Sequence, residues 1–289
     1  DHQRFYDTAG RFFKEQYPDG KIVQHVLDGV GNFTKTTWPD SYFIDRIFDQ
    51  LNRLTDIKLN GSGTSAVQFV YNALSQRTQM TYANGATISY QPQLNGDLTG
   101  IAHIFVGSAI TFSYGYSNAH ELVYSGSSDT ASVWHPSGSS SVTYATADSV
   151  NKYPAVGGTS YSHDGNSNLT ADGTWTYGFN TQNQLLSANK SGVSASFVYD
   201  PLNRQSQKTV GTAKSRYIYS GWQRIADYDG VTDSLQTRYV YGVGLDEPLV
   251  AIAAGGTLTY LHHDRLGSIT ATSDSSGVLA NKNKFGPFG

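Results

Sequence analysis

The chain has 289 residues, of which 15% are charged, and its formal net charge is −3 at pH 7. This balance provides no basic surface for a nucleic acid, and the lack of cysteine excludes disulfide bonds and thiolate metal sites. Thirty glycines and 20 tyrosines beside a single methionine argue against a helix bundle and favour thin β-sheets that keep one face wet.

A membrane-spanning helix needs roughly 18 or more consecutive apolar residues, and the chain has no such run. Its longest apolar stretch, residues 249–254, has the length of a strand. No signal peptide follows Asp1, so we expect a fragment or a processed piece of a longer protein.

A short motif recurs along the chain roughly every 19 to 24 residues. Each copy has an aromatic residue, then Asp or another turn residue, then Gly or Asn three positions later, then Arg or a polar residue. The clearest copies contain Tyr6, Asp7, Gly10 and Arg11; Phe48, Asp49, Asn52 and Arg53; and Tyr199, Asp200, Asn203 and Arg204. Weaker copies begin at Leu27, Tyr71, Tyr90, Tyr114, Tyr177, Tyr219, Tyr241, His263 and Phe285. Such self-similarity predicts a repeat protein in which each unit buries a face on its neighbours.

The segments between the motifs alternate with a period of two, as in residues 216–219 and 238–241, which predicts short strands. Tight turns that tolerate positive φ are expected at Gly20, Gly61, Gly85, Gly96, Gly173 and Gly230, which follow Asp or Asn. We therefore predict an all-β protein, an open or partial spiral of antiparallel hairpins that pair edge to edge.

The motif residues have a structural explanation. The Asp after the aromatic residue can bond to backbone two residues on, and Gly10, Asn52, Asn203 and Gly267 supply positive φ. Arg11, Arg53 and Arg204 either stack on a neighbouring Tyr or pair with the turn Asp.

The period breaks between residues 125 and 160, which are rich in Ser and Gly. We expect repeats over 1–124, a degenerate or loop-rich connection over 125–160, and further repeats over 161–289.

The repeated Tyr-Asp-x-x-Gly/Asn-Arg motif resembles the YD repeat of the Rhs/teneurin superfamily. The stretch 260–268, with Asp264 and Gly267, followed by Gly277 and 285–289, resembles the opening of the Rhs-associated core. The resemblance implies a β-sheet that spirals into a hollow shell. In bacterial members the shell encloses a toxic C-terminal domain, and in teneurins it is part of a cell-surface adhesion receptor.

The resemblance also implies an aspartyl autoprotease with an Asp-Pro-x-Gly motif, which we expect beyond residue 289. Asp200-Pro201 is not this motif, because Leu202-Asn203 follows it inside an ordinary repeat. We therefore predict no enzyme activity and no cofactor in this chain.

Two clusters suggest chemistry but have a simpler explanation. His262, His263 and Asp264 would be the centre of an enzyme fragment, yet adjacent strand residues point to opposite faces, so the two imidazoles do not easily share a metal. Residues 164–168 have three calcium-loop ligand positions but lack the loop's Gly and its bidentate Glu. We predict turns at both and no metal.

The leading hypothesis is a non-enzymatic segment of an exported, secreted or cell-surface bacterial shell. Its partners would be a polypeptide (toxin) cargo or adjoining parts of a longer Rhs-type chain, and not a nucleic acid. One alternative is an adhesion module that binds glycans or proteins through Trp134 or Trp222, with Trp38 and Trp175 as further candidates. Another is a fibre that assembles through the unpaired edge at residues 4–6.

Overall fold

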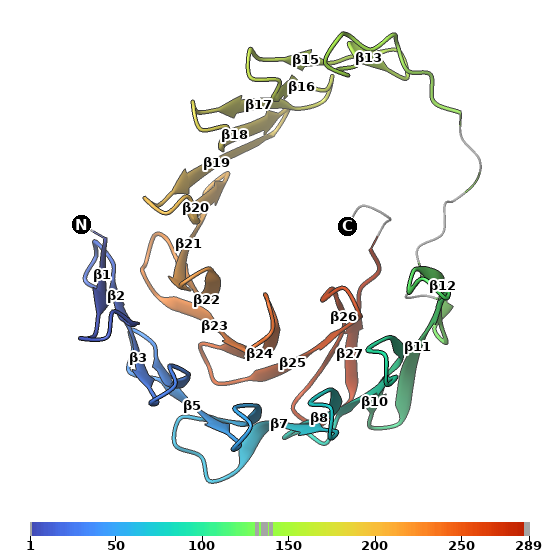
Figure 1. Cartoon of the computed structure of the whole chain (residues 1–289). Coiled ribbons are helices and arrows are strands. Elements are labelled where there is room, and N and C mark those ends of the chain that lie inside the picture. Colours follow the sequence, from blue (N-terminus) through green and yellow to red (C-terminus); the bar gives the residue numbers. More distant parts are fainter. Residues whose placement is uncertain (1, 131–132, 134–137, 139–140, 286–289) are drawn as a thin grey trace. The chain divides into compact units, whose positions relative to one another are not determined.

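The structure, a computed structural model, describes residues 2–130, 133, 138 and 141–285, and these form strands and turns without an α-helix. Figure 1 shows the chain as a succession of short hairpins. The predicted all-β fold of short antiparallel hairpins is confirmed. No helix able to cross a bilayer is present in this described part of the chain.

The first sheet has twelve strands, and all of them pair with their neighbours in sequence. They are β1 (Gln3–Tyr6), β2 (Phe12–Gln16), β3 (Ile22–Leu27), β4 (Phe33–Thr37), β5 (Phe43–Phe48), β6 (Leu54–Leu59), β7 (Ser65–Tyr71), β8 (Arg77–Tyr82), β9 (Thr87–Pro92), β10 (Leu98–Phe105), β11 (Ser108–Tyr116) and β12 (Leu122–Ser127).

A pair of two-residue strands, β13 (Ala155–Val156) and β14 (Thr159–Ser160), precedes a second sheet of thirteen strands, again in sequence order. Its strands are β15 (Ser162–His163), β16 (Leu169–Ala171), β17 (Thr176–Phe179), β18 (Leu185–Lys190), β19 (Val193–Tyr199), β20 (Gln205–Val210), β21 (Ala213–Ser220), β22 (Gln223–Asp229), β23 (Leu235–Tyr241), β24 (Pro248–Ala253), β25 (Leu258–His263), β26 (Ile269–Ser273) and β27 (Leu279–Lys282).

The chain forms two compact units. The first comprises residues 1–135, 219–225 and 237–289, and the second comprises 136–218 and 226–236. The division of the repeats at residues 124 and 160 remains a prediction.

The first unit has a two-layer core. Ile44, Ile57 and Met80 of the first sheet and Val240 and Leu249 of the second are fully buried. Tyr82 of β8 packs against Tyr260 of β25 with ring centroids 5.1 Å apart. Figure 1 shows β24–β27 alongside the strands of the first sheet. Each layer keeps one wet face, as the composition predicts for thin sheets, and buries the other face against its neighbour.

A β-bulge recurs at the ends of strands in both sheets, directly before the motif turns. The register shifts between Phe5 and Tyr6, and it shifts again between Ile47 and Phe48 and between Val198 and Tyr199. A bulge places two residues opposite one and bends the strand. The motif aromatic residue therefore stands at the position where each strand turns back.

Two details of the expected turns are wrong. Gly230 does not have positive φ; the turn is longer there, and Asp233 has φ of 59° instead. The motif copies expected at Tyr90, Tyr114 and Tyr177 start two residues later, since the turns begin at Gln93, Ser117 and Asn180. The reason is that residues two apart lie on the same face of a strand, so either fits the aromatic position.

Substitution of Gly267 by Val should destabilise the protein by about 1–3 kcal/mol, because Gly267 has φ of 85° and a β-branched residue is strained there. Gly255→Val is the matched control, because Gly255 is also a turn glycine with open space around it but without positive φ. Urea unfolding of both variants measures the difference. Equal unfolding midpoints would contradict the assignment of backbone strain to Gly267.

Candidate functional site

The recurring feature of the molecule is a clamp that closes each motif turn. In the first copy, Oδ1 of Asp7 accepts the backbone N–H groups of Ala9 and Arg11, both at 2.9 Å. The Arg11 side chain donates through Nε to Oδ2 of Asp7 at 2.8 Å. These backbone and side-chain bonds from Arg11 lower the pKa of Asp7. The carboxylate thus satisfies turn N–H groups that no strand partner reaches.

The same clamp recurs in the other clear copies. Asp49 accepts from the backbone and from Nε of Arg53, at 3.0 and 2.8 Å. Asp200 accepts in the same way from Arg204, at 3.0 and 2.7 Å. In neutral copies of the clamp, Asn replaces the Asp and Gln replaces the Arg, as in Asn72 with Gln76 and Asn180 with Gln184.

The fourth residue of each turn has positive φ. The values are 75° at Gly10, 62° at Asn52, 64° at Asn203 and 85° at Gly267. Sequence reasoning missed Ser75, His120 and Ser167, which hold the same conformation in other copies. Because these residue types rarely have positive φ, only the spacing from the preceding copy indicates their role.

The side chain of the fifth residue of a turn also reaches the next motif turn, which lies beside it at the same ends of the strands. Arg11 donates through Nη1 to the carbonyl of Asp28 at 2.8 Å, and Gln76 donates through Nε2 to the carbonyl of Gln93 at 2.8 Å. In the second unit Gln184 donates to Oδ1 of Asn203 at 3.2 Å. We call this chain of clamped and bridged turns the turn ladder.

The motif tyrosine ties each repeat to the one before it. The hydroxyl groups of Tyr71, Tyr116 and Tyr199 donate to the carbonyls of Leu54, Leu98 and Leu185 at 2.9, 3.1 and 3.0 Å. Each acceptor is the first residue of the strand that follows the previous motif turn. The Arg53 guanidinium lies 5.0 Å from the ring centre of Tyr71, so this Arg both pairs with an Asp and stacks on a Tyr. Tyr6, in the first copy, is 54% exposed.

A second set of polar side chains crosses between the two layers of the first unit. Tyr17 donates to the carbonyl of Tyr219 and Trp38 donates to that of Ile225, both at 2.9 Å. His103 Nε2 lies 3.0 Å from the carbonyl of His263. Trp38 is only 2% exposed. Its candidacy as a sugar-binding residue is therefore wrong, because its ring packs inside the core.

The cluster at His262, His263 and Asp264 is a buried part of this layered region. Oδ1 of Asp264 accepts the backbone N–H groups of Leu266 and Ser268, both at 2.9 Å, as in the other motif turns. His262 Nε2 bonds to Oγ of Ser273 at 2.9 Å. Among the described residues, no three His, Asp or Glu side chains come together as metal ligands.

The stretch that resembles a calcium loop is also a motif turn. Asp164 accepts the backbone N–H groups of Asn166 and Asn168 at 2.9 Å, and Nδ2 of Asn168 donates to Oδ2 of Asp164 at 2.9 Å. The carboxylate oxygens are thus engaged within the turn.

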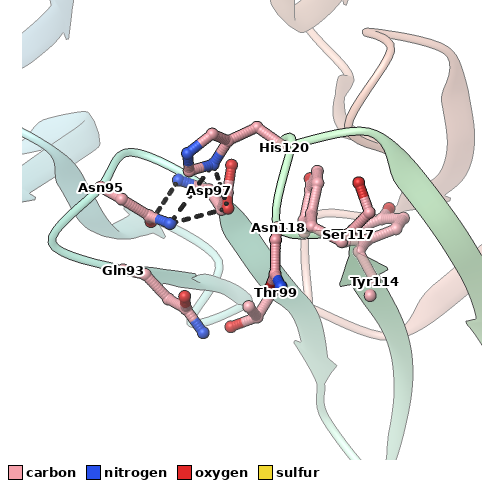
Figure 2. Close-up of a pocket in the computed structure, with 10 residues that line it drawn as sticks. Gln93, Asn95, Asp97, Thr99, Tyr114, Ser117, Asn118 and His120 are labelled. Atoms are coloured by element: carbon pink, nitrogen blue, oxygen red, sulfur yellow. Dashed lines mark hydrogen bonds and ion pairs between the residues drawn. The ribbon is translucent and has the colours of Figure 1, made fainter.

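The exposed side of the turn ladder contains a polar pocket of about 480 Å³ between two neighbouring turns (Figure 2). His120 Nδ1 lies 2.9 Å from Oδ2 of Asp97, and Nδ2 of Asn95 donates to the same oxygen at 2.9 Å. Ser117 also lines the pocket, but its Oγ accepts the N–H groups of Ala119 and Glu121 at 3.2 and 3.3 Å. The hydroxyl group therefore serves as the cap of its own turn.

The two tryptophans expected to face a ligand have different outcomes. Trp222 is 77% exposed and lies in the turn between β21 and β22. Trp134 lies outside the described residues.

The sequence of the chain matches a known family. The family model described as "Teneurin YD-shell" matches residues 108–289, well over half of the chain. This chain belongs to the teneurin YD-shell family. The resemblance inferred from the repeats is confirmed, and the coarse role of the chain is that of a structural shell scaffold.

Two solved structures share the fold of this YD-shell chain. The Photorhabdus luminescens Tc holotoxin pore is 13% identical with a TM-score of 0.65 over 94% of this chain and 18% of that chain. The crystal structure of TcdB2-TccC3-TEV is 12% identical with a TM-score of 0.66 over 98% of this chain and 20% of that chain.

Two bacterial proteins are similar in sequence to the YD-shell chain. The "tRNA3(Ser)-specific nuclease WapA" of Bacillus spizizenii is 30% identical over 156 residues, and the "tRNA nuclease WapA" of Bacillus subtilis is 30% identical over 157 residues. Each match covers 53% of this chain and 7% of the WapA protein, so the YD-shell chain spans a small part of these relatives.

Asp49→Ala should destabilise the protein by about 1–3 kcal/mol, because two turn N–H groups and the Arg53 side chain lose their acceptor. Asp49→Asn keeps the Oδ1 acceptor that Asn72 provides in another copy, and it should cost distinctly less. Urea unfolding at pH 7 compares the two variants. An equal loss in both would show that the clamp acts by charge alone.

Acidification should destabilise the first unit. Burial lowers the pKa of His25 to about 3 and that of His103 to about 4, and it also lowers the pKa values of His262 and His263. The unfolded chain therefore takes up these protons first, and stability is lost as the pH falls below the ordinary value of 6.5. Well below pH 6.5, His25 and His103 should each remove up to about 1.4 kcal/mol per pH unit.

Urea unfolding between pH 7.5 and 5 measures this loss, and return to pH 7.5 should restore the original midpoint. Asp7 and Asp49 of the clamps do not contribute over this range, because their pKa values are lowered from 3.8 and both carboxylates stay charged. Buried imidazole signals that titrate near pH 6.5 in NMR spectra of the folded protein would contradict this prediction.

Proposed function

We propose that this chain is a wall segment of an exported YD shell that encloses a polypeptide cargo belonging to the same larger protein or assembly. The observation that carries the proposal is the turn ladder, in which each repeat is clamped internally and bonded to the next. In the first copy, Arg11 holds Asp7 of its own turn and the carbonyl of Asp28 in the next. A wall needs this continuity, and it needs no reacting group.

The names of the similar proteins support a toxin-type cargo and an extracellular location. The structural neighbours are parts of Tc toxin assemblies, and the sequence relatives carry the name of nucleases. Since this chain covers only 7% of each WapA protein, we assign the nuclease named there to other parts of those proteins and the wall to this part. The partners are then cargo and adjoining shell segments.

A nuclease is the second candidate. The WapA relatives are named as nucleases, and the polar pocket of this chain contains an imidazole, His120, beside the carboxylate of Asp97. An imidazole beside a carboxylate is a common general base. Three observations weigh against it. The possible nucleophile Ser117 is engaged by two backbone N–H groups, and no metal cluster is present in the described ranges. The net charge of −3 also disfavours RNA binding.

Enclosure can be tested with an unfolded, protease-sensitive reporter polypeptide joined after Gly289 of the full chain. In the matched control the same reporter is inserted beside Leu94, which is 91% exposed at a turn tip. We expect the terminal reporter to be digested at least several-fold more slowly than the inserted one, because a wall restricts the access of the protease. Equal digestion rates would remove the support for enclosure and favour adhesion or fibre formation.

A second experiment, with the purified chain, tests the nuclease candidate. Incubated with transfer RNA, the purified chain should leave the RNA intact. Cleavage that His120→Asn abolishes, with the fold retained, would instead assign catalysis to the pocket in Figure 2.

A further inference from the structure

A second and larger cavity, of about 950 Å³, lies within the first unit beside the turn ladder. Phe12, Phe33 and Phe48 of the first sheet line one side, and the exposed side chains of Trp222 and Leu245 line the other. This volume is within the range of small-molecule sites, roughly 300–1,000 Å³. The walls offer apolar and aromatic surface to a ligand.

One strong charge faces this apolar cavity without a counter-ion. Arg46 of β5 lines it, half-buried, and donates through Nη1 to Oγ1 of Thr36 at 2.9 Å and through Nη2 to the carbonyl of Tyr241 at 3.2 Å. No carboxylate of the described residues pairs with it. Burial lowers the pKa of Arg46 to about 10, so it stays charged at pH 7.

Asp246 is the carboxylate that also lines this cavity, but it does not neutralise Arg46. Its side chain is exposed, it forms no ion pair with Arg46, and it also lines a smaller neighbouring cavity next to His263. A guanidinium has five N–H donors, and two of those of Arg46 are used within the protein. The remaining donors and the charge are available to a ligand.

A hydrogen-bonded relay provides a second donor. Oγ1 of Thr36 accepts from Arg46, and we assign its own hydroxyl hydrogen to Nδ1 of His25, which lies 3.1 Å away. With Nδ1 accepting, Nε2 of the neutral His25 ring donates to Oγ of Ser220 at 3.0 Å. The hydroxyl hydrogen of Ser220, which lines the cavity, is then free to donate to a ligand.

The relay does not make Ser220 a nucleophile. Burial and the charge of Arg46 lower the pKa of His25 to about 3, so this imidazole is a poor base. In the assigned tautomer it donates to Ser220 and does not remove the serine proton. The arrangement therefore recognises a ligand and does not react with it.

We propose that this cavity binds a carboxylate attached to a hydrophobic group, with the carboxylate between Arg46 and the Ser220 hydroxyl and the apolar part on the phenylalanines and Trp222. A guanidinium and a hydroxyl both donate to carboxylate oxygens, and the aromatic walls supply apolar contact surface for the hydrophobic group. Two sources offer this chemistry, a free aromatic acid and the C-terminal residue of a peptide. The proposal does not depend on the enclosure of a cargo.

Isothermal titration of the full chain with N-acetyl-phenylalanine, against N-acetyl-phenylalanine amide, tests the site. The acid should bind at least about tenfold more tightly than the amide, because the charge-assisted bonds are lost with the amide. A tetrapeptide that ends in Phe, with a free or an amidated terminus, distinguishes the sources. Tighter binding of the free-terminus peptide than of N-acetyl-phenylalanine assigns the site to chain ends, and the reverse assigns it to small acids.

Arg46→Gln and Ser220→Ala should each bring the affinity for the acid down toward that for the amide, whereas Trp222→Ala should weaken both ligands alike. Arg216→Gln is the matched control, since Arg216 pairs with Asp233 of its own unit and does not line the cavity. Circular dichroism checks each fold, and Ser220→Ala decides the question if Arg46→Gln unfolds. Equal binding of acid and amide, or no binding of either at millimolar concentration, would overturn the proposal.

Discussion

The hairpin turn is the element on which the rest of this molecule depends. At every motif turn the backbone leaves strand pairing, and its N–H groups need acceptors. One side chain placed at the start of the turn, such as Asp49, supplies these acceptors and at the same time holds the side chain of Arg53. Because Arg53 is held, its remaining donors are aimed at the next turn, where the Asn72 carbonyl accepts. The side chains that satisfy the backbone N–H groups of one turn thus also link that turn to the next repeat.

The two layers of the first unit extend the same principle to longer range. Backbone carbonyls of the second sheet, such as those of Tyr219 and Ile225, accept from Tyr17 and Trp38. Aromatic residues suit this role because they bring a large apolar face and a single donor at the tip. The tyrosine-rich composition is thereby explained. The same type of residue fills the core and meets the polar groups that the core would otherwise leave unsatisfied.

The strand pattern and the clear motif copies could be predicted because their causes lie within a few residues. Asp7, Gly10 and Arg11 interact within one turn, so the sequence contains the whole interaction. The burial of Trp38 could not be predicted, because its partner Ile225 is 187 positions away. The cavity at Arg46 was missed for the same reason. Its walls come from segments that meet only once both sheets are assembled.

The bonds between the layers also limit how such a chain can change length in evolution. Tyr17 meets Tyr219 near the start of the first sheet, and Asn84 meets Ser273 farther along it. An in-frame duplication or deletion of one repeat in a single layer would shift every later pair by a whole hairpin. Gene rearrangements that survive selection should therefore add or remove repeats in both layers together. Single-layer changes should be confined to stretches without a partner layer.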